Sequence, residues 1–352
     1  MTGAGTVGRG TAGAGPWWFG GAGIGNLGRE VTDPVARATV DAAWEAGVRG
    51  FDTAPHYGLG LGERRLGAAL AGRPRGAFQV STKVGRVLEP ATTPGPRGPR
   101  GPSGADPGGD DLVNGFAVPA RYRRIWDVSR AGVERSLADS LDRLGLGHAD
   151  ALYLHDPDEY DPAAAVPGGP AGPEAALHTG LRALAALRAE GAIRAVGVGS
   201  KSVPTLTAAV RTGLVDVVMV AGRYTLLEQP AAPLLAECAA RGVGVVAAGV
   251  FNSGALSRPE PDPSLPYEYG AMPAPVYERI SAIRAACERH GVDLPTAALA
   301  FPRRAPAVTA VAVGAQSPEQ VGENAVRAAT PVPPGLWADL AAAGLIEEAA
   351  GT

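Results

Sequence analysis

The chain has 352 residues, 45% of them hydrophobic, and a formal net charge of −3 at pH 7. A core of this size fits one α/β barrel as well as two average domains, and the near-neutral charge argues against a nucleic-acid partner or an anionic membrane surface. The chain opens without a signal pattern, and no apolar run approaches the roughly 18 residues of a membrane helix, so we expect a cytoplasmic protein.

Cysteine and lysine are both rare. Cys238 and Cys287 stand far from any second Cys or His at metal-ligand spacing, so we expect free buried thiols and no metal site. Of the 32 Lys and Arg residues, only Lys83 and Lys201 are lysine. A guanidinium is bulkier than an ammonium and its charge cannot be tuned, so both lysines are candidate site residues.

The N-terminal part begins with a Gly-, Ala- and Thr-rich stretch, residues 1–16, that predicts a frayed tail. A strand is expected at 17–21. The glycine spacing at 23–28 then matches a dinucleotide-binding fingerprint. A helix cap follows only at Thr32-Asp33-Pro34, too late for a Rossmann unit, so we expect a flexible loop at a strand end.

From Pro34 onward, helical and strand patterns alternate. After a first helix, further strands are expected at 48–53, 78–83, 151–155, 195–199, 215–221, 244–248 and 308–313. The helices between and after them are expected at 61–71, 129–144, 174–190, 203–212, 230–241, 276–290 and 317–327, with extra helices near 295–303 and 336–343. Eight apolar strands alternating with eight helices predict a single-domain (β/α)8 TIM barrel over 17–346.

Two long Pro- and Gly-rich segments interrupt this alternation, after strands three and four. Residues 88–116 show no periodicity and predict either a lid over a site or disorder. Residues 156–173 predict a second long loop.

Four ionisable side chains fall at one rim of such a barrel. Asp52 ends strand two, Tyr57 follows it, Lys83 ends strand three and His155 ends strand four. Because the carboxyl ends of the strands form the working face of a βα barrel, we expect these four to meet.

Several segments resemble the aldo-keto reductase family: Phe51-Asp52-Thr53-Ala54 with Tyr57-Gly58, Ser81-Thr82-Lys83-Val84-Gly85, Leu152 to His155, and Gly314-Ala315 with Ser317-Pro318-Glu319-Gln320. The resemblance implies that Asp52, Tyr57, Lys83 and His155 form a catalytic tetrad beside an extended nicotinamide cofactor. Hydride transfer to or from a carbonyl carbon needs a proton at the oxygen, and Tyr57 is the expected acid or base. We expect Lys83 to lower the pKa of Tyr57, Asp52 to hold Lys83 in place, and His155 to orient the substrate.

The same resemblance implies a set of cofactor contacts. They are Gly21, Ser200, Lys201, Phe251, Asn252, Ser253, Gly254, Gly314, Gln316, Gln320, Glu323 and Asn324. Strand seven has no aromatic residue at its end to stack on the nicotinamide, which is a departure from the family. Either Tyr224 or Phe251 takes this place, or the stacking contact is absent. Gly314–Gln320 contains no Lys or Arg for the 2′-phosphate of NADP, which predicts NAD over NADP, although Lys201 could still reach a phosphate.

Further segments, 155–158, 221–227 and 249–254, resemble the bacterial sugar-dehydrogenase branch of that family. This implies oxidation of an aldose of the L-fucose or D-threo type to its lactone, with His56, Trp126 and Tyr224 as candidate substrate contacts. Core packing explains Trp126 and Tyr224 equally well. The alternatives are a general aldehyde or ketone reductase, a pyridoxal 4-dehydrogenase, or a nucleotide-binding regulatory subunit, which would not require Tyr57 and Lys83 together.

Overall fold

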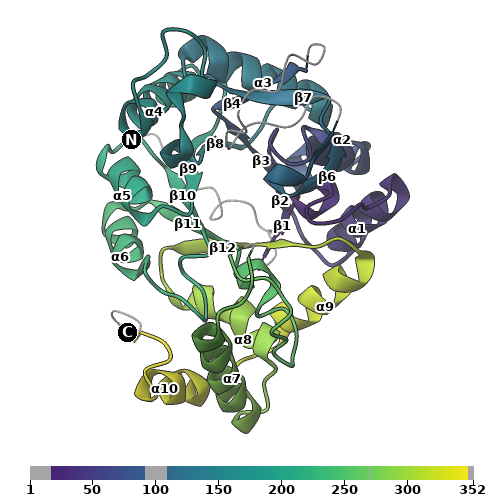
Figure 1. Ribbon diagram of the computed structural model, residues 1–352, viewed down its shortest axis with the longest axis vertical. Coiled ribbons are helices and arrows are strands. Elements are labelled where there is room, and N and C mark those ends of the chain that lie inside the picture. The colour runs from purple at the N-terminus through teal and green to yellow at the C-terminus, as the bar shows by residue number, and fades with distance from the viewer. Residues whose placement is uncertain (1–16, 92–108, 269, 348–352) are drawn as a thin grey trace.

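The computed structural model describes residues 17–91, 109–268 and 270–347. Its centre is a closed barrel of parallel strands in the order β1-β2-β3-β8-β9-β10-β11-β12, with β12 paired to β1. Helices surround the barrel (Figure 1). The predicted single-domain (β/α)8 TIM barrel is confirmed, and the predicted tail at 1–16 lies outside the described residues.

The barrel strands lie close to the predicted positions. They are β1 (Trp18–Gly20), β2 (Gly50–Asp52), β3 (Gln79–Val84), β8 (Ala151–His155), β9 (Ala195–Ser200), β10 (Val217–Ala221), β11 (Gly244–Ala248) and β12 (Val308–Gly314). The helices are α1 (Asp33–Glu45), α2 (Leu61–Leu70), α3 (Arg130–Leu144), α4 (Pro173–Ala189), α5 (Val203–Arg211), α6 (Ala232–Arg241), α7 (Ala274–Arg289), α8 (Leu294–Ala300), α9 (Pro318–Ala329) and α10 (Pro334–Ala342). No helix among the described residues has both the length and the apolar character to cross a membrane.

Inside the barrel, large side chains on some strands pack against small residues on the neighbouring strands. Trp18 and Tyr153 are fully buried and belong to a cluster made of strand residues. A Cβ atom on Gly50 would lie 2.3 Å from the Trp18 ring, and one on Gly197 would lie 2.4 Å from the Tyr153 ring. The two glycines therefore make room for the two aromatic rings, and the interior is packed solid.

Serine caps fix the points at which outer helices begin. Ser129 accepts a hydrogen bond from the backbone of α3, Ser202 from α5 and Ser317 from α9. A capping oxygen satisfies an N–H group that has no partner within the helix. Ser202 and Ser317 follow β9 and β12 within three residues, so these caps also fix the rim where cofactor contacts are expected.

The chain between β3 and α3 leaves the barrel as a strand-paired excursion. β4 (Arg86–Pro90) pairs antiparallel with β7 (Tyr122–Trp126), and β5 (Asp110–Asp111) pairs with β6 (Phe116–Pro119). The expectation of no regular structure across 88–116 is wrong at both ends of that segment, while 92–108 lies outside the described residues. The Pro and Gly residues concentrate between the paired strands and hide them in the sequence. A lid function for this excursion stays a prediction.

The Gly-rich segment after β1 is not the flexible loop that was expected. Gly23–Gly25 form a buried 3-10 turn, and Ile24 is fully buried. α1 begins at Asp33, as the rejection of a Rossmann unit required. The turn is ordered because it packs against the segment that carries Tyr57.

Candidate active site

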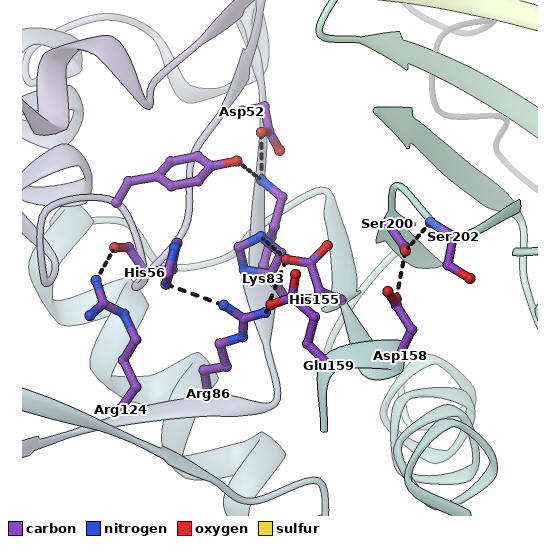
Figure 2. A network of polar contacts seen from close by, with 12 residues as sticks. Asp52, His56, Lys83, Arg86, Arg124, His155, Asp158, Glu159, Ser200 and Ser202 are labelled. Atoms are coloured by element: carbon purple, nitrogen blue, oxygen red, sulfur yellow. Dashed lines mark hydrogen bonds and ion pairs between the residues drawn. The ribbon is translucent and has the colours of Figure 1, made fainter. Parts of the chain in front are cut away.

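Lys83 lies at the centre of the polar network at the carboxyl ends of β2, β3 and β8. Its Nζ donates to Asp52 Oδ2 at 2.6 Å, to the backbone oxygen of Thr53 at 3.0 Å and to Tyr57 Oη at 3.0 Å. Figure 2 shows the contact between Lys83 and Asp52. The residue is 2% exposed, and the three bonds use all three protons of the ammonium. Lys83 is thus a fixed, buried positive charge.

Neighbouring strands hold the two charged groups in register. Asp52 lies opposite Ser81 in the β2–β3 pairing, and the Ser81 hydroxyl donates to Asp52 Oδ1 at 2.7 Å. Lys83 stands two residues beyond Ser81, so both side chains point to the same face of β3. The predicted meeting of Asp52, Tyr57 and Lys83 is what the structure shows.

Close backbone contacts fix the turn that carries Tyr57. Gly58 has φ of 62°, and a Cβ atom there would lie 2.2 Å from the backbone oxygen of Gly25. A Cβ atom on Gly25 would lie 2.9 Å from the Tyr57 backbone. Only glycine fits at either position, so the two segments pack directly and set where the phenol points.

The charge balance at Tyr57 differs from the sequence-based expectation. Burial raises the pKa of Tyr57 to about 12, while Lys83 lowers it by a smaller amount and Asp52 raises it. Lys83 therefore lowers the pKa of Tyr57, as expected, but burial raises it by more. The phenol is desolvated, and the Lys83 ammonium is shared with Asp52. For Lys83 burial alone would lower the pKa, but Asp52 and Tyr57 raise it above its ordinary value. At neutral pH the phenol keeps its proton and the ammonium stays charged.

His155 completes the group at the end of β8. Its ring centroid lies 5.9 Å from that of Tyr57, with the rings nearly perpendicular. Burial, followed by the charges of Arg86 and Lys83, holds the pKa of His155 well below its usual value. A neutral imidazole can donate one hydrogen bond without carrying charge. Nε2 lies 3.4 Å from Asp156 Oδ2, which is longer than a good hydrogen bond.

His56, a predicted substrate contact, lies beside His155 at a ring-centroid distance of 5.5 Å. Its Nδ1 is 3.4 Å from Arg86 Nη1. A guanidinium only donates, so Nδ1 accepts and the proton lies on Nε2. Burial and the charge of Arg124 hold the pKa of His56 well below its usual value, which agrees with a neutral ring.

Several residues at the mouth of the barrel, around Tyr57 and His155, were not found from the sequence. Arg86 donates to Asp156 Oδ2 at 3.1 Å and to Glu159 Oε2 at 2.6 Å. The Phe116 ring lies 6.1 Å from that of Tyr57, and Arg124 donates to the backbone oxygen of His56 at 2.9 Å. All come from the excursion or from the residues after β8. The one available signal was that Asp156 directly follows the end of one predicted strand and that Arg86 comes shortly after the end of another.

The predicted cofactor contacts lie at the ends of β9, β11 and β12. Ser200 Oγ donates to Asp158 Oδ1 at 2.6 Å and accepts from the backbone of Ser202 (Figure 2). Lys201 Nζ lies 2.8 Å from Glu268 Oε2. After β11, residues 252–254 all have positive φ, and Phe251 is half-buried.

The remaining cofactor candidates line the segment after β12. Gln316 Nε2 donates to the backbone of Leu27 at 2.6 Å, and its Oε1 accepts from Arg29 Nε at 2.9 Å. Gln320 accepts from the Gln316 backbone, Glu323 pairs with Arg327, and Asn324 is buried. Arg29 brings a cation from a distant part of the chain to a segment that has none of its own.

Two features of the rim could serve a ligand. Within the described residues, the buried Asn252 Oδ1 has no hydrogen-bond partner. A Cβ atom on the exposed Gly314 would have no contact nearer than 3.8 Å, so the backbone there is open to a ligand. A Cβ atom on Gly21 would lie 2.8 Å from the backbone oxygen of Asp52, so that position is closely packed. No cluster of His, Cys, Asp or Glu within the described ranges could hold a metal ion.

The other two predicted substrate contacts lie under the mouth rather than in it. The Tyr224 ring packs 5.3 Å from that of Phe301 within the hydrophobic core, so core packing explains it and a role in stacking or substrate binding is not supported. The Trp126 ring is buried beneath the Arg86 guanidinium, which lies 4.7 Å from the ring centroid. Trp126 therefore supports the site indirectly, by packing beneath Arg86.

The sequence and the fold both resemble those of known proteins. Residues 17–343 match the model of the Aldo/keto reductase family. The chain is 47% identical to D-threo-aldose 1-dehydrogenase from a Pseudomonas species, over 93% of each chain. It is 34% identical to pyridoxal 4-dehydrogenase from Microbacterium luteolum, over 92% of each chain. Its fold matches a holo aldo-keto reductase from Bacillus halodurans with a TM-score of 0.70, at 24% identity over 96% of this chain and 93% of that one.

Proposed function

The chain belongs to the aldo/keto reductase family, and we propose that it oxidises an aldose at the anomeric carbon to the corresponding lactone. Enzymes of this family are oxidoreductases that use a nicotinamide dinucleotide. The observation that carries the proposal is the buried Lys83 ammonium held between Asp52 and the Tyr57 phenol, in a chain 47% identical to D-threo-aldose 1-dehydrogenase.

The bound nicotinamide would accept the hydride that leaves the anomeric carbon. Tyr57 takes the proton from the anomeric hydroxyl, and the Lys83 ammonium stabilises the phenolate that accepts it. The neutral His155 donates from Nε2 to the same oxygen and orients it. In the reverse reaction Tyr57 returns the proton to the carbonyl oxygen. The carbon that loses the hydride becomes the lactone carbonyl carbon.

Ser200, residues 251–254 and the segment from Gln316 to Asn324 would hold the cofactor, and we infer a preference for NAD. No Lys or Arg occurs in 314–320, and Lys201 is paired with Glu268. Arg29 is the nearby cation that could favour NADP instead. Michaelis constants for NAD and NADP, measured with wild type and Arg29→Gln, test this. A clear wild-type preference for NADP would overturn it, and loss of that preference in Arg29→Gln would assign it to this cation.

A steady-state assay tests the reaction itself. L-fucose, D-arabinose and pyridoxal are offered with NAD, and aldehydes with NADH. Turnover of an aldose with formation of the lactone is the expected result. Turnover of pyridoxal alone would favour the activity of the Microbacterium relative. Reduction of aldehydes without oxidation of any aldose would favour a general reductase, and cofactor binding without turnover a regulatory subunit. Residence in the cytoplasm stays a prediction.

A further inference from the structure

A carboxylate that the tetrad does not use lies beside the reacting position. Asp156 Oδ2 is 3.4 Å from His155 Nε2 and 3.1 Å from Arg86 Nη2. Figure 2 shows the Arg86 side chain between His56 on one side and the carboxylates after β8 on the other. The separation from His155 is too long for a good hydrogen bond, so His155 Nε2 and Asp156 Oδ2 can each form a hydrogen bond with a bound ligand.

The backbone holds this carboxylate in place. Asp156 has φ of 42° and ψ of 56°, a left-handed conformation uncommon for a residue with a side chain, and its N–H donates to the backbone oxygen of Gly199 at 2.8 Å. Arg86 bridges it to Glu159, whose side chain is 62% exposed, whereas that of Asp156 is 23% exposed. Asp156 therefore faces the mouth, and Glu159 holds Arg86 from the solvent side.

We propose that Asp156 accepts a hydrogen bond from the hydroxyl on the carbon next to the one oxidised, which makes aldoses with a free 2-hydroxyl the preferred substrate class. This inference rests on the proposed function. The reacting oxygen must lie within reach of both Tyr57 Oη and His155 Nε2. The oxygen on the neighbouring carbon of a sugar lies about one hydrogen-bond length from the reacting oxygen. Because Asp156 Oδ2 is 3.4 Å from His155 Nε2, that neighbouring oxygen can come within hydrogen-bond reach of Asp156 when the reacting oxygen is bound to His155. A substrate without that hydroxyl would leave the carboxylate with Arg86 as its ion-pair partner but without the hydrogen bond that the ligand supplies.

The charge on Asp156 depends on its surroundings. Burial raises the pKa of Asp156 to about 6, against the opposing effect of Arg86. The ionisable groups that face it are Tyr57, Lys83, Arg86, His155, Asp158 and Glu159. The carboxylate is therefore charged above about pH 6 and gains its proton below it, so the hydrogen bond to the 2-hydroxyl weakens as the pH falls through that value.

Substrate pairs that differ only in this hydroxyl test the proposal. L-fucose is compared with 2-deoxy-L-fucose, and D-arabinose with 2-deoxy-D-ribose, in wild type and in Asp156→Asn. Asparagine tolerates the left-handed backbone, so the fold should be retained. We expect wild type to prefer the 2-hydroxylated sugar by about 10- to 100-fold in kcat/KM, and Asp156→Asn to lose most of that preference. Glu159→Gln, which touches the same Arg86 from the solvent side, is the matched control and should keep the preference.

The outcomes separate the inference from the proposed function. Equal turnover of both sugars of a pair by wild type, or an unchanged preference in Asp156→Asn, overturns the inference alone. No oxidation of any aldose overturns the proposed function and the inference with it. The pH profile needs no variant: kcat/KM for the 2-hydroxylated sugar relative to its 2-deoxy partner should fall below about pH 6. A ratio that does not change across that pH would also contradict the role of Asp156.

Discussion

Replacing Lys83 by methionine tests how the centre of the site is held together. Methionine has a similar length but carries no charge, so all three hydrogen bonds of the ammonium are lost. Asp52 is 3% exposed and keeps only the Ser81 hydroxyl as a side-chain donor. A buried charge that loses its partner costs about 3–5 kcal/mol, and we expect the free energy of unfolding of Lys83→Met to fall by that amount.

The same substitution should remove catalysis by a separate route. Lys83 is the group that lowers the pKa of Tyr57 against the effect of burial. Without it the phenolate loses its stabilising charge, and we expect kcat for aldose oxidation to fall by roughly 10²- to 10⁴-fold. Production of reduced cofactor, followed by absorbance under saturating substrate, measures this.

A double variant separates stability from catalysis. Asp52→Asn combined with Lys83→Met removes both charges, so no buried charge is left without its partner. Urea unfolding should therefore show that the double variant recovers most of the stability lost in Lys83→Met, while its kcat stays low. A double variant as unstable as the single one would refute the argument from an uncompensated charge. A single variant with near wild-type kcat would refute the role of Lys83.

Three further predictions follow from burial and charge. Tyr57→Phe should lower kcat roughly 10²- to 10⁴-fold and leave cofactor affinity, measured by fluorescence titration, unchanged, because Lys83 keeps its bonds to Asp52 and Thr53. Because the pKa of Tyr57 is about 12, kcat/KM for oxidation, which needs the phenolate, should rise about tenfold per pH unit from neutral pH upward, and a plateau near neutrality would contradict this. Burial raises the pKa of the Cys238 and Cys287 thiols to about 12, so a thiol reagent should modify both only after unfolding, and rapid labelling of the folded enzyme would disprove it.

The sequence was enough to predict the barrel and the meeting of the tetrad. Short apolar strands alternate with amphipathic helices along most of the chain, and parallel strands in a closed barrel bring their carboxyl ends to one rim. Asp52, Lys83 and His155 each stand at or beside such an end. Neither step needs a contact between distant residues to be known in advance.

Properties that depend on a balance of distant contacts could not be predicted. The sign of the Tyr57 pKa shift depends on how far burial outweighs Lys83, and burial here comes from the excursion residue Phe116 as well as from the barrel. Arg29 reaches Gln316 across 287 positions of the chain, which no local pattern reveals. Tyr224 follows a strand end as Tyr57 does, yet its ring packs in the core against Phe301.

The residues of the site differ in how firmly the fold holds them, because some stand on barrel strands and others on connecting segments. Asp52, Lys83 and His155 stand on barrel strands whose register is fixed by pairing on both sides, so their geometry can change little without opening the barrel. Arg86 belongs to the excursion, and Asp156 lies in the loop after β8. Such connecting segments vary more freely than the strands that carry them. A change in Arg86 or Asp156 should therefore alter which alcohol is oxidised while the proton transfer at Tyr57 stays the same, and the tetrad alone cannot identify the substrate.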